Sequence, residues 1–355
     1  MNCCVLSDWV AFTTAQSNVL LMNKSNDEMK ILECGNDHVV CIKCSQSRKL
    51  FATCSNSKVL KIWDTSSFQC CGTRVVSKSV TAICFTQDDS LILVADKTGD
   101  VHSYSTDDIG KEGTFLLGHL SMLLDMVITM DQKYVITADR DEKIRISHFP
   151  NAYNIKAYCL GHTDFISCLL QCIHYEHVLI SGSGDGTVKT WDFEHGRLLH
   201  TEFCSSPRTI GVKPNPVSRV AGLSTKPFIA VAIESDPNVT VYEIRSDGIL
   251  TTNCSVTLEA SPFSVCFDNS SCLWMCQADE VNHLVCFDWI EDSTSWRRIT
   301  NNDNSTLKKC NEWYKSQGAY CKERKLSVLR KQEIDNVSTY MKVKEERITA
   351  TEKRY

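Results

Sequence analysis

Residues 161–192 read GHTDFISCLLQCIHYEHVLISGSGDGTVKTWD, and this stretch decides the fold. A Gly-His pair opens it, an apolar segment follows, and a Ser-Gly-Ser run leads into Asp185 and Gly186 before a last segment ends at Trp191 and Asp192. Repeats of about 40 residues with this pattern form the four-stranded blades of WD-repeat β-propellers. We therefore expect a propeller, a rigid disc whose loops bind other molecules.

Further copies of the pattern occur along the chain at spacings of about 41–51 residues, and each shows the period-2 alternation of a strand followed by a polar turn. The segments that match the last part of the intact copy are residues 50–64, 91–105, 134–148, 228–244 and 273–289. Together with the intact copy they predict six blades between about residues 36 and 290. Strand-like runs in residues 5–33 predict most of a seventh blade. We expect residues 295–299 to supply its end strand and so close the ring, which would protect the edge strands.

The chain is assigned to the all-β class, with a seven-bladed propeller in residues 1–300 and a short, basic, partly helical or disordered extension in residues 301–355. Residues 308–355 contain 13 Lys and Arg against seven Asp and Glu, which leaves 25 basic and 36 acidic residues in 1–307. An acidic disc is not a broad nucleic-acid-binding surface. For the basic extension, RNA contact, nuclear import and a solvated helical end all stay open.

Cysteine usage and the absence of targeting patterns favour the reducing interior of a cell. Most of the 20 cysteines, such as Cys84 and Cys266, lie in apolar runs where a reduced thiol acts as a small hydrophobe. The first residues lack a basic stretch followed by an apolar run, and no segment has the ~18 apolar residues that a membrane span needs. Cys41 and Cys44 have CxxC spacing without a second pair at zinc-site distance, so no metal site is expected.

His162, Ser181 and Asp185 resemble the constellation of a serine hydrolase, but propeller geometry gives them a structural role. A chain of hydrogen bonds from Trp191 through Ser181 and His162 to Asp185 would satisfy buried polar groups and lock the blade. No GxSxG-type nucleophile turn is present, and we predict no catalytic residue. The preceding repeat carries a partial copy of the network, with Ser147 in place of the tryptophan: His119, Thr137 and Asp141.

The turn in residues 137–147, TADRDEKIRIS, departs from the small residues of the repeat pattern. With Asp141 at the structural turn position, charged neighbours project around it. The loop that leads into the next repeat lies on the same face and adds Asp164 and Phe165. Mixed charge around an aromatic side chain is typical of protein interfaces, although a merely soluble turn is the alternative. The predicted neighbours of the turn are Asp139, Arg140, Glu142 and Lys143.

Three stretches make the sequence recognisable: ADRDEKIRIS (138–147), LGHTDFIS (160–167) and NVSTYMKVKEERI (336–348). They resemble the WD-repeat, non-catalytic subunit of tRNA (guanine-N7-)-methyltransferase, the family that includes the insect protein Wuho. The resemblance implies a scaffold that binds a Rossmann-type catalytic subunit side-on and stabilises its active form. That partner would carry S-adenosylmethionine, and the heterodimer would methylate N7 of a guanine in the tRNA variable loop.

The resemblance also implies where the partner binds and where the protein acts. Cys168 stands where the family pattern often has a basic residue, so one anchoring ion pair of the interface is expected to be missing. The chain itself would need no cofactor, would meet tRNA mainly through the complex, and would bind no membrane. The implied location is the nucleus, with the cytoplasm as an additional one. Partner contacts are expected at Asp139, Arg140, Glu142, Lys143, Asp164 and Phe165, with Cys168 beside them.

The residues agree with a non-catalytic role and leave two rival interpretations. No glycine-rich loop for S-adenosylmethionine opens a βαβ unit. Substrate adaptors of ubiquitin ligases, the alternative function, often carry Arg two residues beyond the Trp-Asp pair, which WDTS (63–66) and WDFE (191–194) lack. A propeller hydrolase would need carboxylates or histidines clustered at the central channel, and no recurring set is found.

Overall fold

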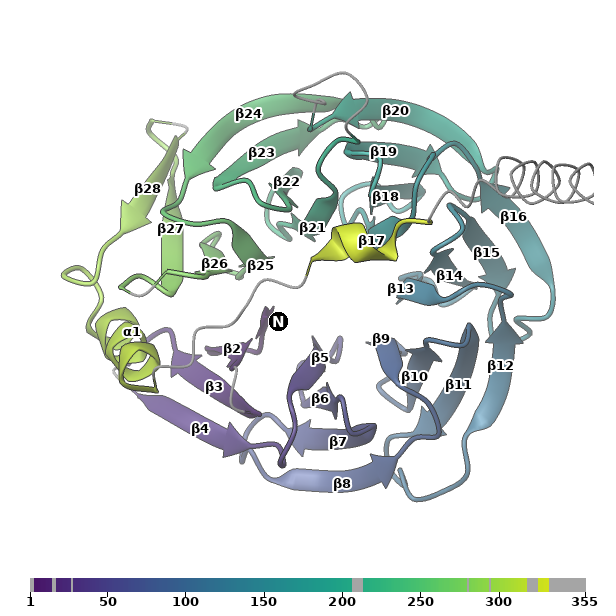
Figure 1. Ribbon diagram of the computed structural model, residues 1–355, viewed down its shortest axis with the longest axis horizontal. Coiled ribbons are helices and arrows are strands. Elements are labelled where there is room, and N and C mark those ends of the chain that lie inside the picture. Colours follow the sequence, from purple (N-terminus) through teal and green to yellow (C-terminus); the bar gives the residue numbers. More distant parts are fainter. Residues whose placement is uncertain are drawn as a thin grey trace, which may run out of the picture.

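The computed structural model describes residues 3–14, 17–26, 28–205, 213–279, 281–293, 295–317 and 325–331. In these residues 28 strands form seven antiparallel sheets of four strands each. The sheets surround a common axis as the blades of a closed disc (Figure 1). The predicted seven-bladed propeller is therefore confirmed.

Each blade consists of four consecutive strands, which lie side by side in chain order from the centre of the disc to its rim. Blades 1 and 2 contain β1 (Cys3–Val5), β2 (Trp9–Thr13), β3 (Asn18–Asn23), β4 (Met29–Glu33), β5 (Val39–Cys44), β6 (Leu50–Ser55), β7 (Val59–Asp64) and β8 (Cys70–Val75). Blades 3 and 4 contain β9 (Val80–Phe85), β10 (Leu91–Asp96), β11 (Asp100–Ser105), β12 (Thr114–Gly118), β13 (Leu123–Ile128), β14 (Tyr134–Asp139), β15 (Ile144–His148) and β16 (Ile155–Cys159). Blade 5 contains β17 (Ile166–Gln171), β18 (Val178–Ser183), β19 (Thr187–Asp192) and β20 (Arg197–Phe203). Blades 6 and 7 contain β21 (Val217–Gly222), β22 (Phe228–Ile233), β23 (Asn238–Ile244), β24 (Leu250–Thr257), β25 (Pro262–Phe267), β26 (Leu273–Gln277), β27 (Leu284–Ile290) and β28 (Ser295–Ile299).

The hydrophobic core lies between neighbouring blades, because each sheet packs against a neighbouring sheet on each of its two faces. The middle strands are accordingly buried along their whole length, as in β18 and β19. One core cluster joins Leu93 of blade 3 to Met126 and Val135 of blade 4. The outermost strands have only one buried neighbour and are mostly exposed, as β16 is.

The ring closes in a different way from the one expected. Residues 295–299 form β28, which pairs with β27 of its own blade, with Trp296 opposite Trp289. The N-terminal blade is completed by β1, whose Cys3 lies opposite Phe12 of β2. The expectation that residues 295–299 supply the missing strand of the N-terminal blade was wrong, because the short run at Cys3–Val5 already fills that place. Side-chain packing then joins the first and last blades, and the backbone N–H of Cys3 donates to Ser264 Oγ at 2.8 Å.

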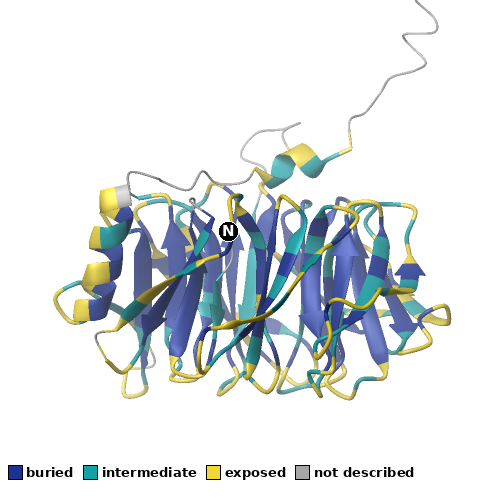
Figure 2. Cartoon of the chain, turned by 90° about the horizontal axis from the view of Figure 1, so that it is seen from below, coloured by how far each residue is buried: buried dark blue, intermediate teal, exposed yellow. Residues whose placement is uncertain are grey.

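The C-terminal extension contributes one helix, α1 (Ser305–Gln317), which covers the junction between blades 7 and 1 (Figure 1). Leu307 and Tyr314 of α1 are buried in the core cluster that both blades share. The side chain of Asn311 accepts from Leu284 N at 2.8 Å and donates to Leu284 O at 3.1 Å, which ties the helix to β27. A short 3-10 helix, η1 (Leu326–Leu329), lies over one face of the disc (Figure 2). None of the helices described has the length and apolar character for a membrane crossing.

Candidate interaction site

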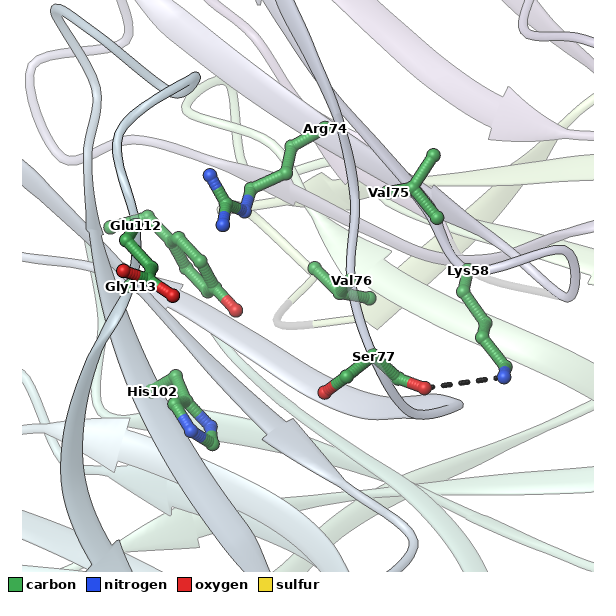
Figure 3. Close-up of a pocket in the computed structure, with 9 residues that line it drawn as sticks. Lys58, Arg74, Val75, Val76, Ser77, His102, Glu112 and Gly113 are labelled. Atoms are coloured by element: carbon green, nitrogen blue, oxygen red, sulfur yellow. Dashed lines mark hydrogen bonds between the residues drawn. The ribbon is translucent and has the colours of Figure 1, made fainter.

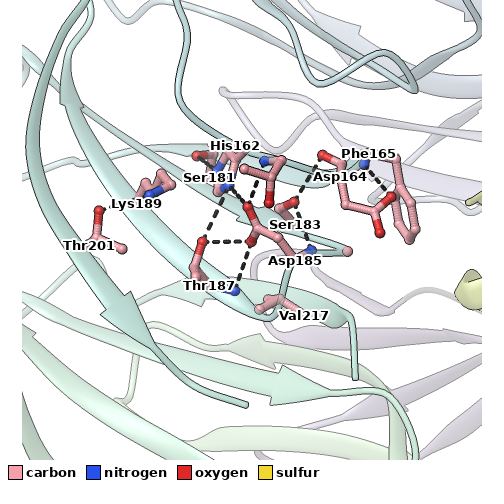
Figure 4. A network of polar contacts seen from close by, with 12 residues as sticks. His162, Asp164, Phe165, Ser181, Ser183, Asp185, Thr187, Lys189, Thr201 and Val217 are labelled. Atoms are coloured by element: carbon pink, nitrogen blue, oxygen red, sulfur yellow. Dashed lines mark hydrogen bonds and ion pairs between the residues drawn. The ribbon is translucent and has the colours of Figure 1, made fainter. Parts of the chain in front are cut away.

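The polar network of blade 5 joins three strands and the loop that leads into them (Figure 4). Trp191 Nε1 donates to Ser181 Oγ at 2.8 Å, Ser181 Oγ lies 2.7 Å from His162 Nε2, and His162 Nδ1 lies 2.9 Å from Asp185 Oδ2. Burial lowers the pKa of His162 despite the opposing effect of Asp185, so the neutral ring is favoured. Burial alone would raise the pKa of Asp185, but hydrogen bonds from His162 and Thr187 outweigh it and hold that pKa below its usual range.

This network cannot act as a hydrolase triad. The Ser181 hydroxyl is fully buried, and it accepts the indole N–H of Trp191. A nucleophile must reach a substrate carbonyl, which this position does not allow. The arrangement instead gives the buried side chains of His162, Ser181 and Trp191 their hydrogen-bond partners.

Blade 4 carries the related network, with one change from the expected residues. His119 Nε2 lies 2.8 Å from Thr137 Oγ1, and His119 Nδ1 lies 3.2 Å from Asp139 Oδ2. Asp139 Oδ1 also accepts the backbone N–H groups of Asp141 and Lys143 at 2.9 and 3.0 Å. Asp139, not Asp141, is therefore the structural carboxylate, and the assignment of Asp141 was wrong. Alignment on the last strand put the acid two residues too late, because Asp139 reaches the histidine from the position of Ser183 in blade 5.

Three of the residues expected at a partner interface lie inside the disc. Asp139 is 2% exposed and Phe165 is 1% exposed. The Phe165 ring covers Gly184 so closely that a Cβ there would lie 2.5 Å from Phe165 Cε1. Cys168 is buried against Gly182, and burial raises the pKa of its thiol to about 11. These side chains shape the face from below and do not present themselves at the surface.

Residues 325–331 cover part of the same face, which the sequence did not lead us to expect. Arg140 Nε donates to Leu329 O at 2.9 Å, and Lys331 Nζ lies 3.2 Å from Glu142 Oε1. Asp164, only 8% exposed, forms an ion pair with Arg330 at 3.1 Å. The sequence feature that could have indicated this contact is the pair Arg330 and Lys331, because a basic extension can pair with the carboxylates of an acidic disc. Of the predicted set, only Lys143 is exposed; the others are buried or half-buried.

Exposed apolar side chains gather on the outer strands of blades 4 and 5, β16 and β20, and beside them. The end of β16 lies beside the turn that leads into β20, since a Cβ at Gly196 would meet the carbonyl oxygen of Tyr158. Leu160 follows Cys159, which pairs with Ile144 just after the 139–143 turn, and Phe203 ends β20 opposite Thr187 of blade 5. Patches of this kind mark interaction surfaces. We call the set the wall patch: Tyr153, Ile155, Tyr158, Leu160, Leu198 and Phe203.

A cavity of about 480 Å³ opens on the rim between blades 2 and 3 (Figure 3). Its cations are already engaged by backbone carbonyls: Lys58 Nζ donates to Ser77 O at 3.2 Å, and Arg74 donates to Gly110 O at 2.9 Å. The Arg74 guanidinium also lies over the Tyr104 ring at 4.9 Å. Within the part of the chain that the structure describes, no group of three or more His, Cys, Asp or Glu is placed to hold a metal ion.

Known proteins share this architecture and sequence. The WD40-domain model of the tRNA methyltransferase TRM82 matches residues 14–108 and 102–310. The chain belongs to this family. It is 37% identical over 301 residues to the tRNA (guanine-N(7)-)-methyltransferase non-catalytic subunit wdr4 of Danio rerio, covering 81% of this chain and 71% of that one. It is 31% identical over 287 residues to the corresponding subunit wuho of Drosophila ananassae, covering 78% and 67%.

Membership of the TRM82 family confirms the resemblance drawn from the three sequence stretches. The relatives are named as non-catalytic subunits, which confirms the prediction of a non-enzymatic chain and gives no support to the ubiquitin-ligase alternative. Among solved structures, the WD40 repeats of RRP9 superpose with a TM-score of 0.68 at 18% identity, covering 77% of this chain and 86% of that one. That likeness shows the propeller fold alone.

Proposed function

We propose that this TRM82-family propeller is the scaffold that binds and stabilises the catalytic subunit of tRNA (guanine-N7-)-methyltransferase in a heterodimer. The catalytic subunit would carry S-adenosylmethionine and the active site. The observation that carries the proposal is the wall patch, an apolar surface beside a turn with charges of both signs. Apolar centres with polar rims are typical of specific protein interfaces.

The geometry favours side-on binding to blades 4 and 5. Phe203 and Tyr153 are 74% and 76% exposed, so large apolar side chains stand free on the wall. Lys143 lies at the end of blade 4 where Leu160 is also exposed. A partner seated on the wall would bury Leu160 and Phe203 and place an acidic group near Lys143. The buried residues Asp139, Phe165 and Cys168 would act by fixing the shape of this edge.

The charge distribution supports tRNA binding mainly through the complex. Residues 1–307 carry 25 basic and 36 acidic residues, so phosphate attraction must come largely from the partner. Residues 308–331 contain eight basic and two acidic residues, whereas residues 332–355 contain five of each. Two of those eight, Arg330 and Lys331, pair with carboxylates of the disc. The extension therefore has less free positive charge to offer RNA than its composition suggests.

Reconstitution with the catalytic subunit of the same organism tests this function. We expect N7-methylation of variable-loop guanine to depend on the chain and to fall at least about tenfold with Arg140→Glu plus Lys143→Glu. Lys97→Glu is the matched control, because Lys97 follows Asp96 in blade 3 as Arg140 follows Asp139 in blade 4, and Asp96 holds its turn in the same way. Methylation that is equal with and without the chain would refute the scaffold role.

We also propose that the protein acts in the nucleus, with a cytoplasmic pool. The basic residues of the extension support import through a receptor for basic segments. A fluorescent fusion of the full chain is expected to concentrate in the nucleus. Exclusion of the fusion from the nucleus would contradict the proposal.

A further inference from the structure

Arg330 fills a pocket that the disc builds from backbone and side-chain acceptors of two blades. Its Nε lies 3.1 Å from Asp164 Oδ2, and its Nη2 donates to Gly184 O at 2.8 Å and to Pro214 O. Asp164 and Gly184 belong to blade 5, and Pro214 leads into blade 6. Nη2 thus donates to two backbone carbonyls while the guanidinium charge lies beside the Asp164 carboxylate, and a planar guanidinium with delocalised charge can supply both contacts at once.

The residues before and after Arg330 are held as well. Lys331 Nζ lies 3.4 Å from Asp141 Oδ1 and 3.2 Å from Glu142 Oε1. At the other end, Glu234 of blade 6 is 5% exposed, and its Oε1 accepts the backbone N–H groups of Leu326 and Ser327. The segment is thus bound through its backbone and through two cations by three neighbouring blades.

This segment lies on the disc without belonging to its core. Val328 is 73% exposed, and η1 has no buried residue. Figure 2 shows η1 above the face, outside the layer of buried strands. Without the segment, Asp164 would keep the N–H of Phe165 but lose its cationic partner, and Glu234 would lose the two backbone N–H groups that it accepts. Both carboxylates would then be open to a cation or an N–H donor from another segment.

We propose that this face carries a binding site for a short basic peptide that ends in Arg-Lys, and that residues 325–331 are its occupant within the same chain. The site consists of the guanidinium pocket at Asp164, the carboxylates of Asp141 and Glu142, and the backbone acceptor Glu234. Its ligand class is a segment with an arginine for the pocket and a lysine directly after it. The site is exchangeable: a peptide of this chemistry binds when the chain's own segment is displaced.

The strength of binding can be bounded from the chain length. Seven residues separate Gln317, the last residue of α1, from Lys325. Two groups joined through so few residues meet at an effective concentration in the millimolar range. Since the segment is docked in the free chain, the same peptide added separately must bind with a Kd of about 1 mM or tighter. Such an affinity is measurable with a labelled peptide.

The test uses the full chain with Arg330→Glu plus Lys331→Glu, which empties the site. A fluorescent peptide of residues 325–331, KLSVLRK, is titrated against it and against the unchanged chain, with fluorescence anisotropy as the readout. We expect the emptied chain to bind at or below about 1 mM and the unchanged chain to bind at least about tenfold more weakly, because its own segment competes. Full-chain Lys325→Glu is the matched control, since Lys325 is exposed in the same segment, and it should behave as the unchanged chain.

Two further variants locate the ligand in the pocket. A peptide with Arg330→Glu, and the emptied chain with Asp164→Asn added, should each lose at least about tenfold in affinity. Thermal unfolding of each variant shows whether the disc stays folded. Equal binding by the emptied and unchanged chains, or no binding up to several millimolar peptide, would overturn the proposal. The assay contains no methyltransferase, so its outcome is independent of the proposed function.

Discussion

The turns at the ends of β14 and β18 occupy the same place in blades 4 and 5, yet they use their carboxylates differently. In blade 5, Asp185 receives the His162 ring, and the network runs on to Trp191. In blade 4, Asp139 receives the His119 ring from two residues earlier, and this leaves Asp141 to pair with Lys331. The turn of blade 5 is wholly structural, whereas the turn of blade 4 keeps the His–Asp contact and also presents a second carboxylate at the surface. A repeat can therefore acquire a surface charge that binds another segment without losing its buried polar network.

The largest effect should come from breaking the lock of blade 5. Ser181→Ala removes the group between Trp191 Nε1 and His162 Nε2 and leaves both without a partner in a buried site. We expect a loss of about 2–4 kcal/mol in the free energy of unfolding. Thr137→Ala in blade 4 is the matched change and should cost about 1–2 kcal/mol. The cost is smaller because blade 4 has Ser147 at the position of Trp191, so no indole N–H loses its partner. Urea denaturation measures both, and equal losses would contradict the comparison.

The next effect separates the two carboxylates of the blade 4 turn. Asp139→Asn weakens the bond to His119 and the support of two backbone N–H groups, and it should cost about 1–2 kcal/mol. Asp141→Asn removes only a half-exposed ion pair with Lys331 and should change stability by less than about 0.5 kcal/mol. The same unfolding assay checks this order. A larger loss for Asp141→Asn would restore the assignment that the structure overturned.

A pH series contrasts histidines with and without partners. His283 packs on Tyr314 of α1 with ring centroids 4.1 Å apart, and burial lowers the pKa of His283 to about 4. Its ordinary pKa is about 6.5, so the unfolded chain binds the proton first and stability falls as the pH drops from about 6.5 toward 4. His283→Phe should make that fall shallower, while His162, whose pKa is also lowered, keeps part of it. Urea midpoints at pH 7 and pH 5 measure the change, and an unchanged difference would refute this account.

The last comparison concerns the two cations of the 325–331 segment. Lys331→Glu affects an exposed ion pair and should change the free energy of unfolding by less than about 0.5 kcal/mol. Arg330→Glu places a carboxylate beside the nearly buried Asp164 and should cost about 1–2 kcal/mol. Thermal unfolding of the two single variants compares them. The same cost for both would mean that the pocket does not discriminate arginine.

Much of the fold could be predicted because blade patterns are local. The intact copy at 161–192 carries its own turn, strands and network residues, so its bonds could be derived from spacing alone. Ring closure could not, because residues 3–5 are too short to be recognised as a strand until β2 pairs with them. The contact between Asp139 and His119 could not be predicted either. Sequence alignment favoured Asp141, but the reach of the side chain decides which carboxylate contacts the histidine.

The place of the partner interface stays a prediction, but the structure shows how its expected residues lie. The sequence put TADRDEKIRIS and GHTDF on one face, where Asp141 and Asp164 both contact residues 330 and 331, yet it gave no measure of depth, and Phe165 and Cys168 are buried. Contacts between distant segments were also beyond its reach. Arg330 and Asp164 are far apart in the chain, and only the folded disc brings them within 3.1 Å. The wall patch was missed because exposed apolar residues on outer strands follow the same alternation as buried ones.

The most direct test of the central claim is the affinity of the catalytic subunit for the full chain, measured by isothermal titration calorimetry. Leu160→Ser plus Phe203→Ser on the wall patch should weaken binding at least about tenfold. Val75→Ser plus Phe115→Ser, which alter similarly exposed residues on β8 and β12, should leave it unchanged. Equal affinity for both double variants would contradict binding at the wall of blades 4 and 5.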